Sequence, residues 1–126
     1  MGKRKVAAKS VEPFKGDIAE LIIQALMEKK GEDITIINLK KVNHVYFDKF
    51  IICSGTSRTH VETLSDYVQE VTKREANIRP AFLEGMMNGE WVLLDYFDII
   101  VHIFQPEARN FYRLESLWND AEIKHL

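Results

Sequence analysis

The strongest constraint on the fold is the segment 50–53 (Phe-Ile-Ile-Cys), in which every side chain is apolar. An amphipathic strand or helix would interrupt such a run with polar residues, whereas a strand covered on both faces needs none. A second apolar segment, 99–104, carries only one histidine. Two strands of this kind predict a sheet lying between layers of helices, which is an α/β architecture.

Two segments place apolar residues at helical spacing. The first begins after Asp17, which can cap a helix with Glu20 three positions on, and it ends before Gly31. The second follows the polar turn 54–57 (Ser-Gly-Thr-Ser) and extends to about Ala76. Its apolar stripe is Val61, Leu64, Val68 and Val71. Each helix is predicted to pack one face against the sheet.

Further strands are predicted at 34–39 and 80–84, and Asn88-Gly89 marks a tight reversal into a strand at 91–95. The reversal 96–98 leads into the strand 99–104. Strand, helix and strand in one sheet imply a right-handed parallel crossover from 50–53 to 80–84.

Residues 107–118 are predicted to form a closing helix. Its inward residues are expected to be Phe111, Leu114 and Leu117, and its outward residues Arg109, Arg113 and Trp118. The element order is α-β-β-α-β-β-β-α, a single domain with a mixed sheet of about five strands flanked by helices.

The 126 residues are enough for one domain. We predict a flexible basic arm at 1–15, the domain at 16–120 and a C-terminal tail at 121–126. The arm contains Lys3, Arg4, Lys5 and Lys9. It is either an untethered terminus or a secondary contact to nucleic acid.

Composition and charge argue against several classes of function. A formal net charge of −2 argues against tight, sequence-blind binding to nucleic acid, because that binding neutralises many phosphates. The single cysteine, Cys53, excludes an internal disulfide and fits a reducing compartment. No apolar run is long enough to cross a bilayer, and no signal-peptide core follows the basic start. We therefore expect a cytoplasmic protein without a membrane contact.

Few residues point to catalysis or metal binding. The four histidines are scattered, so no zinc spacing is present, and His102 is interpreted as a hydrogen-bonded core residue. Ser57, His60 and Asp66 do not converge at helical positions. The turn 54–57 could hold a phosphate, but it lacks the lysine of a Walker motif, so a capped strand-to-helix turn is favoured.

Asp95 and Asp98 flank the reversal at 96–97. Paired carboxylates can bind magnesium, although acids at hairpins are also ordinary turn residues, and the second interpretation is favoured. With the Gly55 turn they define one enzyme alternative, a small nucleotidyltransferase. The chain does not display the cationic clamp that such a site requires.

Large amphipathic side chains gather near loops in the C-terminal half. Met86, Met87 and Trp91 surround a turn, and Tyr96, Tyr112 and Trp118 follow. Aromatic and methionine side chains at exposed loops are typical of protein contacts, while the competing interpretation for any single ring is core packing.

Several ordered motifs resemble the Iojap family, also called ribosomal silencing factors. Asp48 and the segment 50–57 resemble its D-x-x-V-I-x-x-G-x-S motif. Glu84-Gly85, the segment 91–96 and the segment 98–102 are similar to its E-G…W-x-x-x-D-x-x-D-x-x-V-H signature, and 107–118 to its closing segment.

The resemblance implies a nucleotidyltransferase-like α/β fold without that group's catalytic carboxylates, and hence a protein that is not an enzyme and needs no cofactor or metal. It implies binding to large-subunit ribosomal protein fourteen, which would block joining of the two ribosomal subunits and repress translation. A homodimer when free and a role in large-subunit biogenesis are also implied.

The same resemblance carries over particular residues. Trp91, Tyr96 and Tyr112 match the family's ribosomal contact. An acidic surround would come from Glu84, Asp95 and Asp98, and Arg109 would either join the contact or pair with one of these acids. The chain departs from the family where Phe97 replaces a common glycine and Lys49 a frequent aromatic residue.

Overall fold

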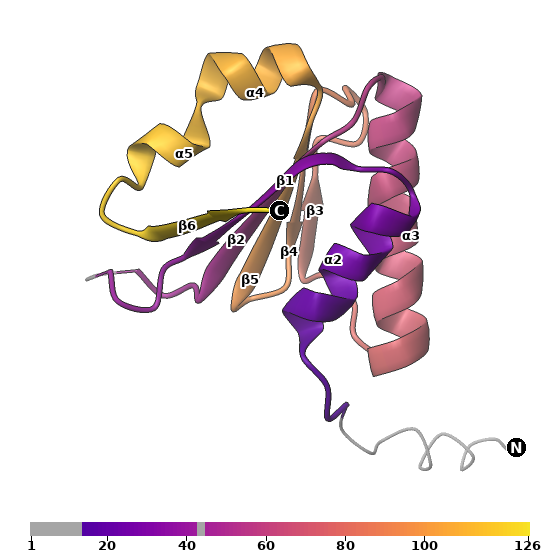
Figure 1. Ribbon diagram of the computed structural model, residues 1–126. Helices are drawn as coiled ribbons and strands as arrows, with labels where there is room; N and C mark the ends of the chain where they lie inside the picture. The colour runs from indigo at the N-terminus through magenta and orange to yellow at the C-terminus, as the bar shows by residue number, and fades with distance from the viewer. Residues whose placement is uncertain (1–13, 43–44) are drawn as a thin grey trace, which may run out of the picture.

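The computed structural model describes residues 14–42 and 45–126. Most of the predicted basic arm therefore lies outside the described residues. A six-stranded sheet with the order β3-β4-β5-β2-β1-β6 forms the centre. Figure 1 shows this sheet nearly edge-on, with α2 and α3 on one side and α4 and α5 on the other. The strands are β1 (Glu32–Asn38), β2 (Lys49–Ser54), β3 (Phe82–Glu84), β4 (Trp91–Asp95), β5 (Ile99–Phe104) and β6 (Glu122–His125). The helices are α2 (Ile18–Glu28), α3 (Arg58–Ala76), α4 (Pro106–Tyr112) and α5 (Leu114–Leu117).

The two apolar strands predicted from the sequence lie side by side at the centre. β2 and β5 pair in parallel, whereas every other neighbouring pair in the sheet is antiparallel. Their side chains alternate between the two helix layers, so both strands are buried on both faces. The prediction of a mixed α/β sheet flanked by helices is thereby confirmed.

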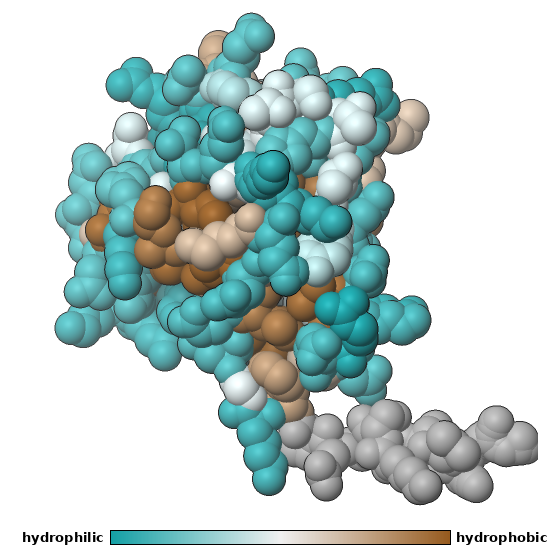
Figure 2. Space-filling view, turned by 45° about the vertical axis from the view of Figure 1, so that its right-hand side comes forward, coloured by the Kyte–Doolittle hydropathy of each residue, from teal (hydrophilic) through white to brown (hydrophobic). Residues whose placement is uncertain are grey.

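Helices α2 and α3 begin and end as predicted. Asp17 caps α2 by accepting a hydrogen bond from the Ala19 N–H at 2.9 Å, and Ser57 caps α3 by accepting from the His60 N–H at 3.1 Å. Their apolar stripes, together with β-strand residues such as Ile51, form one core. The surface brought forward in Figure 2, to which α3 belongs, is largely hydrophilic, with hydrophobic residues gathered in patches.

The segment predicted as a C-terminal tail is instead the sixth strand. β6 pairs antiparallel with β1, and Ile123 lies opposite Ile37. His125 also meets the Thr35 hydroxyl, with 3.1 Å between Nδ1 and Oγ1. The domain boundary predicted at residue 120 therefore moves to the C-terminus. Four alternating residues at an edge carry too short a pattern to predict a strand.

The closing helix is divided in two. Arg113 adopts a left-handed conformation, with φ 51°, between α4 and α5. Leu114, after the break, is buried as predicted, whereas Phe111 and Leu117 are exposed, contrary to the inward placement predicted for both. Arg109, expected outside, is directed inward, and Trp118 packs partly against the core.

The two strands joined by the crossover through α3, β2 and β3, are parallel, as predicted. Because β3, β4 and β5 pair antiparallel in turn, β3 is parallel to β2. It is separated from β2 by two strands and forms the free edge of the sheet.

Deleting residues 121–126 should lower the free energy of unfolding by about 3 kcal/mol, because the deletion removes the Ile123 packing and the ladder to β1. Urea unfolding would measure the change. Lys124→Ala, at an exposed position of the same strand, is the control and should cost about 0.5 kcal/mol or less. Equal stability of the truncated and full chains would contradict a structural role for β6.

Candidate protein-binding face of the sheet

The sheet face opposite α2 and α3 is only partly covered. Side chains on a strand alternate between faces, and directly opposed residues of antiparallel strands share a face. Val92 and Leu94 of β4 belong to the core beneath α2 and α3, so Trp91, Leu93 and Asp95 lie on the other face. The residues directly opposite them on β3 and β5 lie on the same face: Phe82, Glu84, Ile100, His102 and Phe104. We call this set, together with Tyr112 of α4, the candidate face.

Exposure is concentrated at the edge of the candidate face formed by β3 and β4. Phe82 is 62% exposed and Tyr112 is 48% exposed, which is high for aromatic side chains in a folded domain. Glu84 is also exposed, and Trp91, Leu93 and Asp95 are half-buried. An apolar area bounded by acids is typical of a surface that another protein covers.

The centre of the candidate face is a cluster of three aromatic rings in contact, of which Trp91 and Phe104 are stacked. The Trp91 ring lies 4.9 Å from that of Phe104 and 4.6 Å from that of Tyr112, measured between centroids. The loop before β4 requires Gly85, which has φ 88° and whose Cβ would overlap the carbonyl oxygen of Trp91. The loop and the helix α4 thus hold the three rings together.

His102 supplies a polar group beneath these rings. Its side chain is only 4% exposed, and its Nδ1 accepts a hydrogen bond from the Trp91 Nε1–H at 3.1 Å. Burial lowers the pKa of the imidazole from 6.5 to about 4, so the ring is neutral at neutral pH. Nε2 has no hydrogen-bond partner among the described residues. The interpretation of His102 as a hydrogen-bonded core residue is confirmed.

Tyr96 lies on the opposite side of the sheet. Its ring is buried beneath α3, and its hydroxyl is 2.9 Å from the Thr72 hydroxyl. Burial raises the pKa of the Tyr96 phenol, and the hydrogen bond with Thr72 only partly offsets this effect. Because the side chain cannot reach a partner, we remove Tyr96 from the set of contact residues proposed from the sequence.

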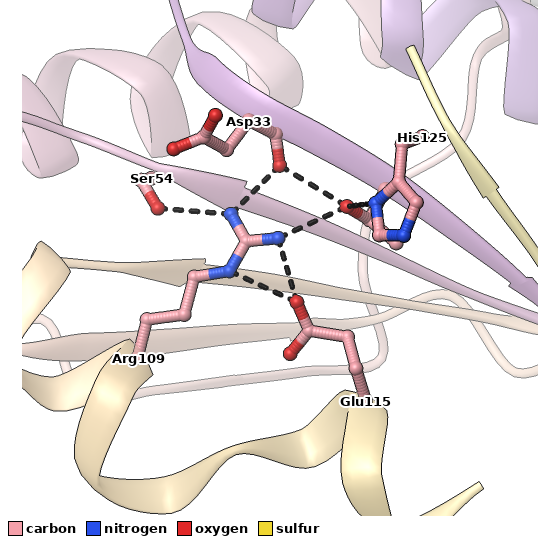
Figure 3. A network of polar contacts seen from close by, with 6 residues as sticks. Asp33, Ser54, Arg109, Glu115 and His125 are labelled. Carbon is pink, nitrogen blue, oxygen red and sulfur yellow. Dashed lines mark hydrogen bonds and ion pairs between the residues drawn. The ribbon is translucent and has the colours of Figure 1, made fainter. Parts of the chain in front are cut away.

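Arg109 is also removed from that set, because its guanidinium is used within the fold. Its side chain is 11% exposed and lies among β1, β2 and α5 (Figure 3). Nη1 donates to the Asp33 carbonyl at 2.7 Å and to the Ser54 hydroxyl at 2.9 Å. Nη2 donates to the Thr35 hydroxyl at 3.0 Å and to the Glu115 carboxylate at 2.8 Å.

Arg109 therefore pairs with an acid, as the sequence allowed, but with Glu115 and not with an acid of the candidate face. Burial raises the pKa of the Glu115 carboxyl, but the hydrogen bonds it accepts and the Arg109 charge outweigh this, so its pKa lies below the ordinary value. A cavity of about 360 Å³ opens beside the network. Since the guanidinium already meets protein acceptors, the cavity offers no free cationic clamp from Arg109.

The residues of the enzyme alternative do not come together. Asp95 lies opposite Ile100 near the start of β5, and the Asp98 carbonyl accepts from the Lys49 N–H at the start of β2. Gly55 follows the other end of β2, six residues away, or about 20 Å along a strand. Asp95 acts as a turn residue, accepting from the Phe97 N–H at 2.8 Å. Within 14–42 and 45–126, no group of three or more His, Cys, Asp or Glu side chains could hold a metal.

The turn 54–57 is a capped strand-to-helix connection. Gly55 donates its N–H to the Phe104 carbonyl at 2.8 Å, and the Thr56 N–H donates to Nδ1 of His60 at 2.9 Å. These amide groups are satisfied within the protein, which leaves them unavailable to a phosphate. Cys53, before the turn, is buried, and desolvation raises the pKa of its thiol to about 12, as expected for a small core residue.

Sequence reasoning missed Leu93, Phe82 and the link between His102 and Trp91. Leu93 could have been predicted from the alternation along 91–95, because it shares a face of the strand with Trp91. Phe82 could not be assigned, since the register of β3 against β4 is a tertiary property.

The fold is an α/β domain whose candidate face exposes aromatic side chains bordered by acids. A sequence model of the family described as "Ribosomal silencing factor during starvation" matches residues 13–126. The ribosomal silencing factor of Halalkalibacterium halodurans is 34% identical over 83% of this chain and 88% of its own length. A crystal structure of protein CV0518 from Chromobacterium violaceum, 36% identical, superimposes with a TM-score of 0.75 and covers 80% of this chain and 82% of that one. The chain belongs to the ribosomal silencing factor family.

A more distant relative comes from mouse. The mitochondrial assembly of ribosomal large subunit protein 1 is 29% identical over 79% of this chain, which spans 44% of that longer protein. In the part of the chain that the structure describes, no helix is long and apolar enough to cross a membrane.

Arg109→Met should lower the free energy of unfolding by about 3 kcal/mol, because it leaves the Glu115 carboxylate and the Ser54 hydroxyl without their donor. Chemical denaturation would measure this change. Arg74→Met removes an exposed arginine with two ion pairs and serves as the matched control, with an expected cost of about 1 kcal/mol or less. If Arg109→Met lowered the free energy of unfolding no more than Arg74→Met does, the Arg109 network would contribute no more than an exposed ion pair.

The free energy of unfolding should fall as the pH decreases from 6.5 to 4.5. The unfolded chain protonates His102 near pH 6.5, whereas the folded protein does so only near pH 4, so acid favours the unfolded state in this window. Denaturation at a series of pH values would measure this. Between pH 6.5 and 4.5, the free energy of unfolding of His102→Gln should fall by about 2 kcal/mol less than that of the wild type. Glu115 adds a further loss only below its ordinary pKa of 4.5. Parallel pH profiles for both proteins would be inconsistent with a buried neutral histidine.

Proposed function

We propose that the protein binds large-subunit ribosomal protein fourteen through the candidate face and thereby blocks joining of the small ribosomal subunit, which represses translation. The exposed aromatic area bounded by acids is the observation that supports this proposal most directly. Family membership supports the ribosomal role in general, since relatives are named ribosomal silencing factors. The mechanism is steric and needs no catalysis or cofactor.

The chemistry of the candidate face favours a basic partner. On the β3 side of the candidate face, Asp95 lies opposite Phe82 and Glu84 lies opposite Leu93. On the other side, a groove of about 330 Å³ lies between Tyr112, Phe111 and two acids, Glu90 and Glu107. Carboxylates on the rim speed encounter and set the register, while the rings at the centre provide most of the binding free energy. A protein rich in lysine and arginine, such as a ribosomal protein, fits this arrangement.

Other parts of the proposal rest mainly on the resemblance. We propose that the free protein is a homodimer, that it acts in the cytoplasm, and that it also contributes to assembly of the large subunit. The printed name of the mouse relative refers to large-subunit assembly, which supports the last point. Any contact of the arm 1–15 with ribosomal RNA is secondary. Asp98, at the far end of β5 from the rings, would contribute only long-range charge.

Trp91→Ala should weaken binding to purified large subunits by about 30-fold or more, which corresponds to about 2 kcal/mol, because the ring is the central anchor of the candidate face. Co-sedimentation over a range of concentrations would measure the affinity. Met27→Ala is the control, since it removes an exposed apolar side chain from α2 on the opposite side of the sheet. Circular dichroism would establish that both variants fold.

Small subunits added to the same samples test the mechanism. The proposal predicts that wild-type protein reduces the joined-ribosome peak and that Trp91→Ala does so only at higher concentration. Retained binding by folded Trp91→Ala protein would sink the assignment of the face. Binding of a nucleotide that depends on magnesium, without binding to large subunits, would instead favour the nucleotidyltransferase alternative.

A further inference from the structure

A side-chain hydrogen bond joins the indole of Trp91 to the neighbouring strand β5, in addition to the backbone pairing of β4 with β5. The indole Nε1–H donates to Nδ1 of His102 at 3.1 Å. Trp91 is opposite Phe104, and His102 is opposite Leu93, so the bond runs diagonally across the β4–β5 ladder. It links the half-buried Trp91, at the centre of the candidate face, to a residue that is only 4% exposed.

This hydrogen bond defines the state of His102. Because Nδ1 accepts, the neutral ring carries its proton on Nε2. Burial keeps the ring unprotonated at neutral pH, with a pKa of about 4. No charged side chain makes a hydrogen bond or ion pair with His102 among the described residues; the rings in contact with it are those of Phe50, Trp91 and Phe104. The indole N–H of Trp91 therefore has a lasting acceptor inside the protein.

The other contacts of Trp91 do not define its orientation to the same degree. Ring-to-ring contacts with Phe104 and Tyr112 tolerate rotation, since dispersion is only weakly directional, whereas a hydrogen bond weakens steeply as its angle closes. Tyr112 is half exposed and rests on the indole. The Tyr112 ring also contacts Phe104 and Phe111, so its position depends in part on that of Trp91.

We propose that His102 is the positioning residue of the candidate face, holding Trp91, and through it Tyr112, in the orientation that meets the partner. This inference rests on the proposed function and adds a statement about the contact itself. Since His102 already accepts the indole N–H, Trp91 offers its partner the flat surface of a ring and no donor. Aliphatic chains and the cationic groups of lysine or arginine fit that surface.

Two variants of His102 separate positioning from packing. His102→Phe keeps an aromatic ring but has no acceptor, while the side-chain oxygen of His102→Gln can accept the indole N–H. Hydrogen exchange of the Trp91 indole N–H, followed by NMR on the free protein, should be slow in the wild type and in His102→Gln. It should be about tenfold faster in His102→Phe. The chain has two tryptophans, so a Trp118→Phe variant assigns the signal.

Affinity for large subunits provides the functional readout. His102→Phe should bind about tenfold more weakly than the wild type, and His102→Gln within about threefold of it. In a Trp91→Phe background, which has a ring but no N–H, His102→Phe should have no further effect, because the two residues act through one contact. A general packing defect would instead add to the effect of Trp91→Phe.

Several results would overturn this inference. Wild-type affinity in a folded His102→Phe protein would do so, and so would additive losses in the double-mutant comparison. If His102→Phe does not fold, hydrogen exchange of the Trp91 indole N–H in the wild type still tests the inference. Exchange as fast as in an unfolded chain would exclude the hydrogen bond to His102. If the wild-type protein does not bind large subunits, the proposed function is refuted, and with it the partner contact. Slow exchange of the indole N–H would in that case still show that His102 holds Trp91.

Discussion

The parallel pairing of β2 and β5 is the interaction on which the rest of the structure depends. Successive side chains of these strands enter opposite layers: Ile51 and Val101 pack beneath α2 and α3, whereas Ile52 and Ile100 pack beneath α4 and α5. Because both layers must exclude water from these strands, neither set of helices is dispensable. The antiparallel strands β4 and β1 then extend the sheet on either side of the central pair.

The two helix layers are unequal, and this inequality creates the candidate face. α3 has 19 residues and α2 has 11, whereas α4 has seven and α5 has four. The left-handed residue Arg113 breaks the short layer, and the hydrogen bonds of Arg109 tie it to β1 and β2. The β3–β4 end of the sheet is covered only in part, where Tyr112 of α4 contacts Trp91. Rings that a longer helix would cover, such as Phe82 and Tyr112, remain exposed there.

Local patterns were sufficient to predict most of the secondary structure. The apolar segments 50–53 and 99–104, the stripe of α3 and the capping residues Asp17 and Ser57 depend only on neighbours in sequence, and the structure agrees with them. The ordered motifs were likewise sufficient to predict the family. The strand β6 and the break at Arg113 escaped prediction, because one is a four-residue edge pattern and the other a single change of φ.

By itself the sequence determined a sheet covered by helices, the positions of its main elements and the family to which the chain belongs. The tertiary structure alone decided which polar-tipped side chains lie on the candidate face and which serve the fold. Tyr96 turns inward because Thr72 lies across from it, and Arg109 because β1, β2 and Glu115 surround it. Trp91 remains at the surface, held from below by a histidine eleven residues away. Such roles depend on what lies opposite a side chain in space, and periodicity along the chain does not record that.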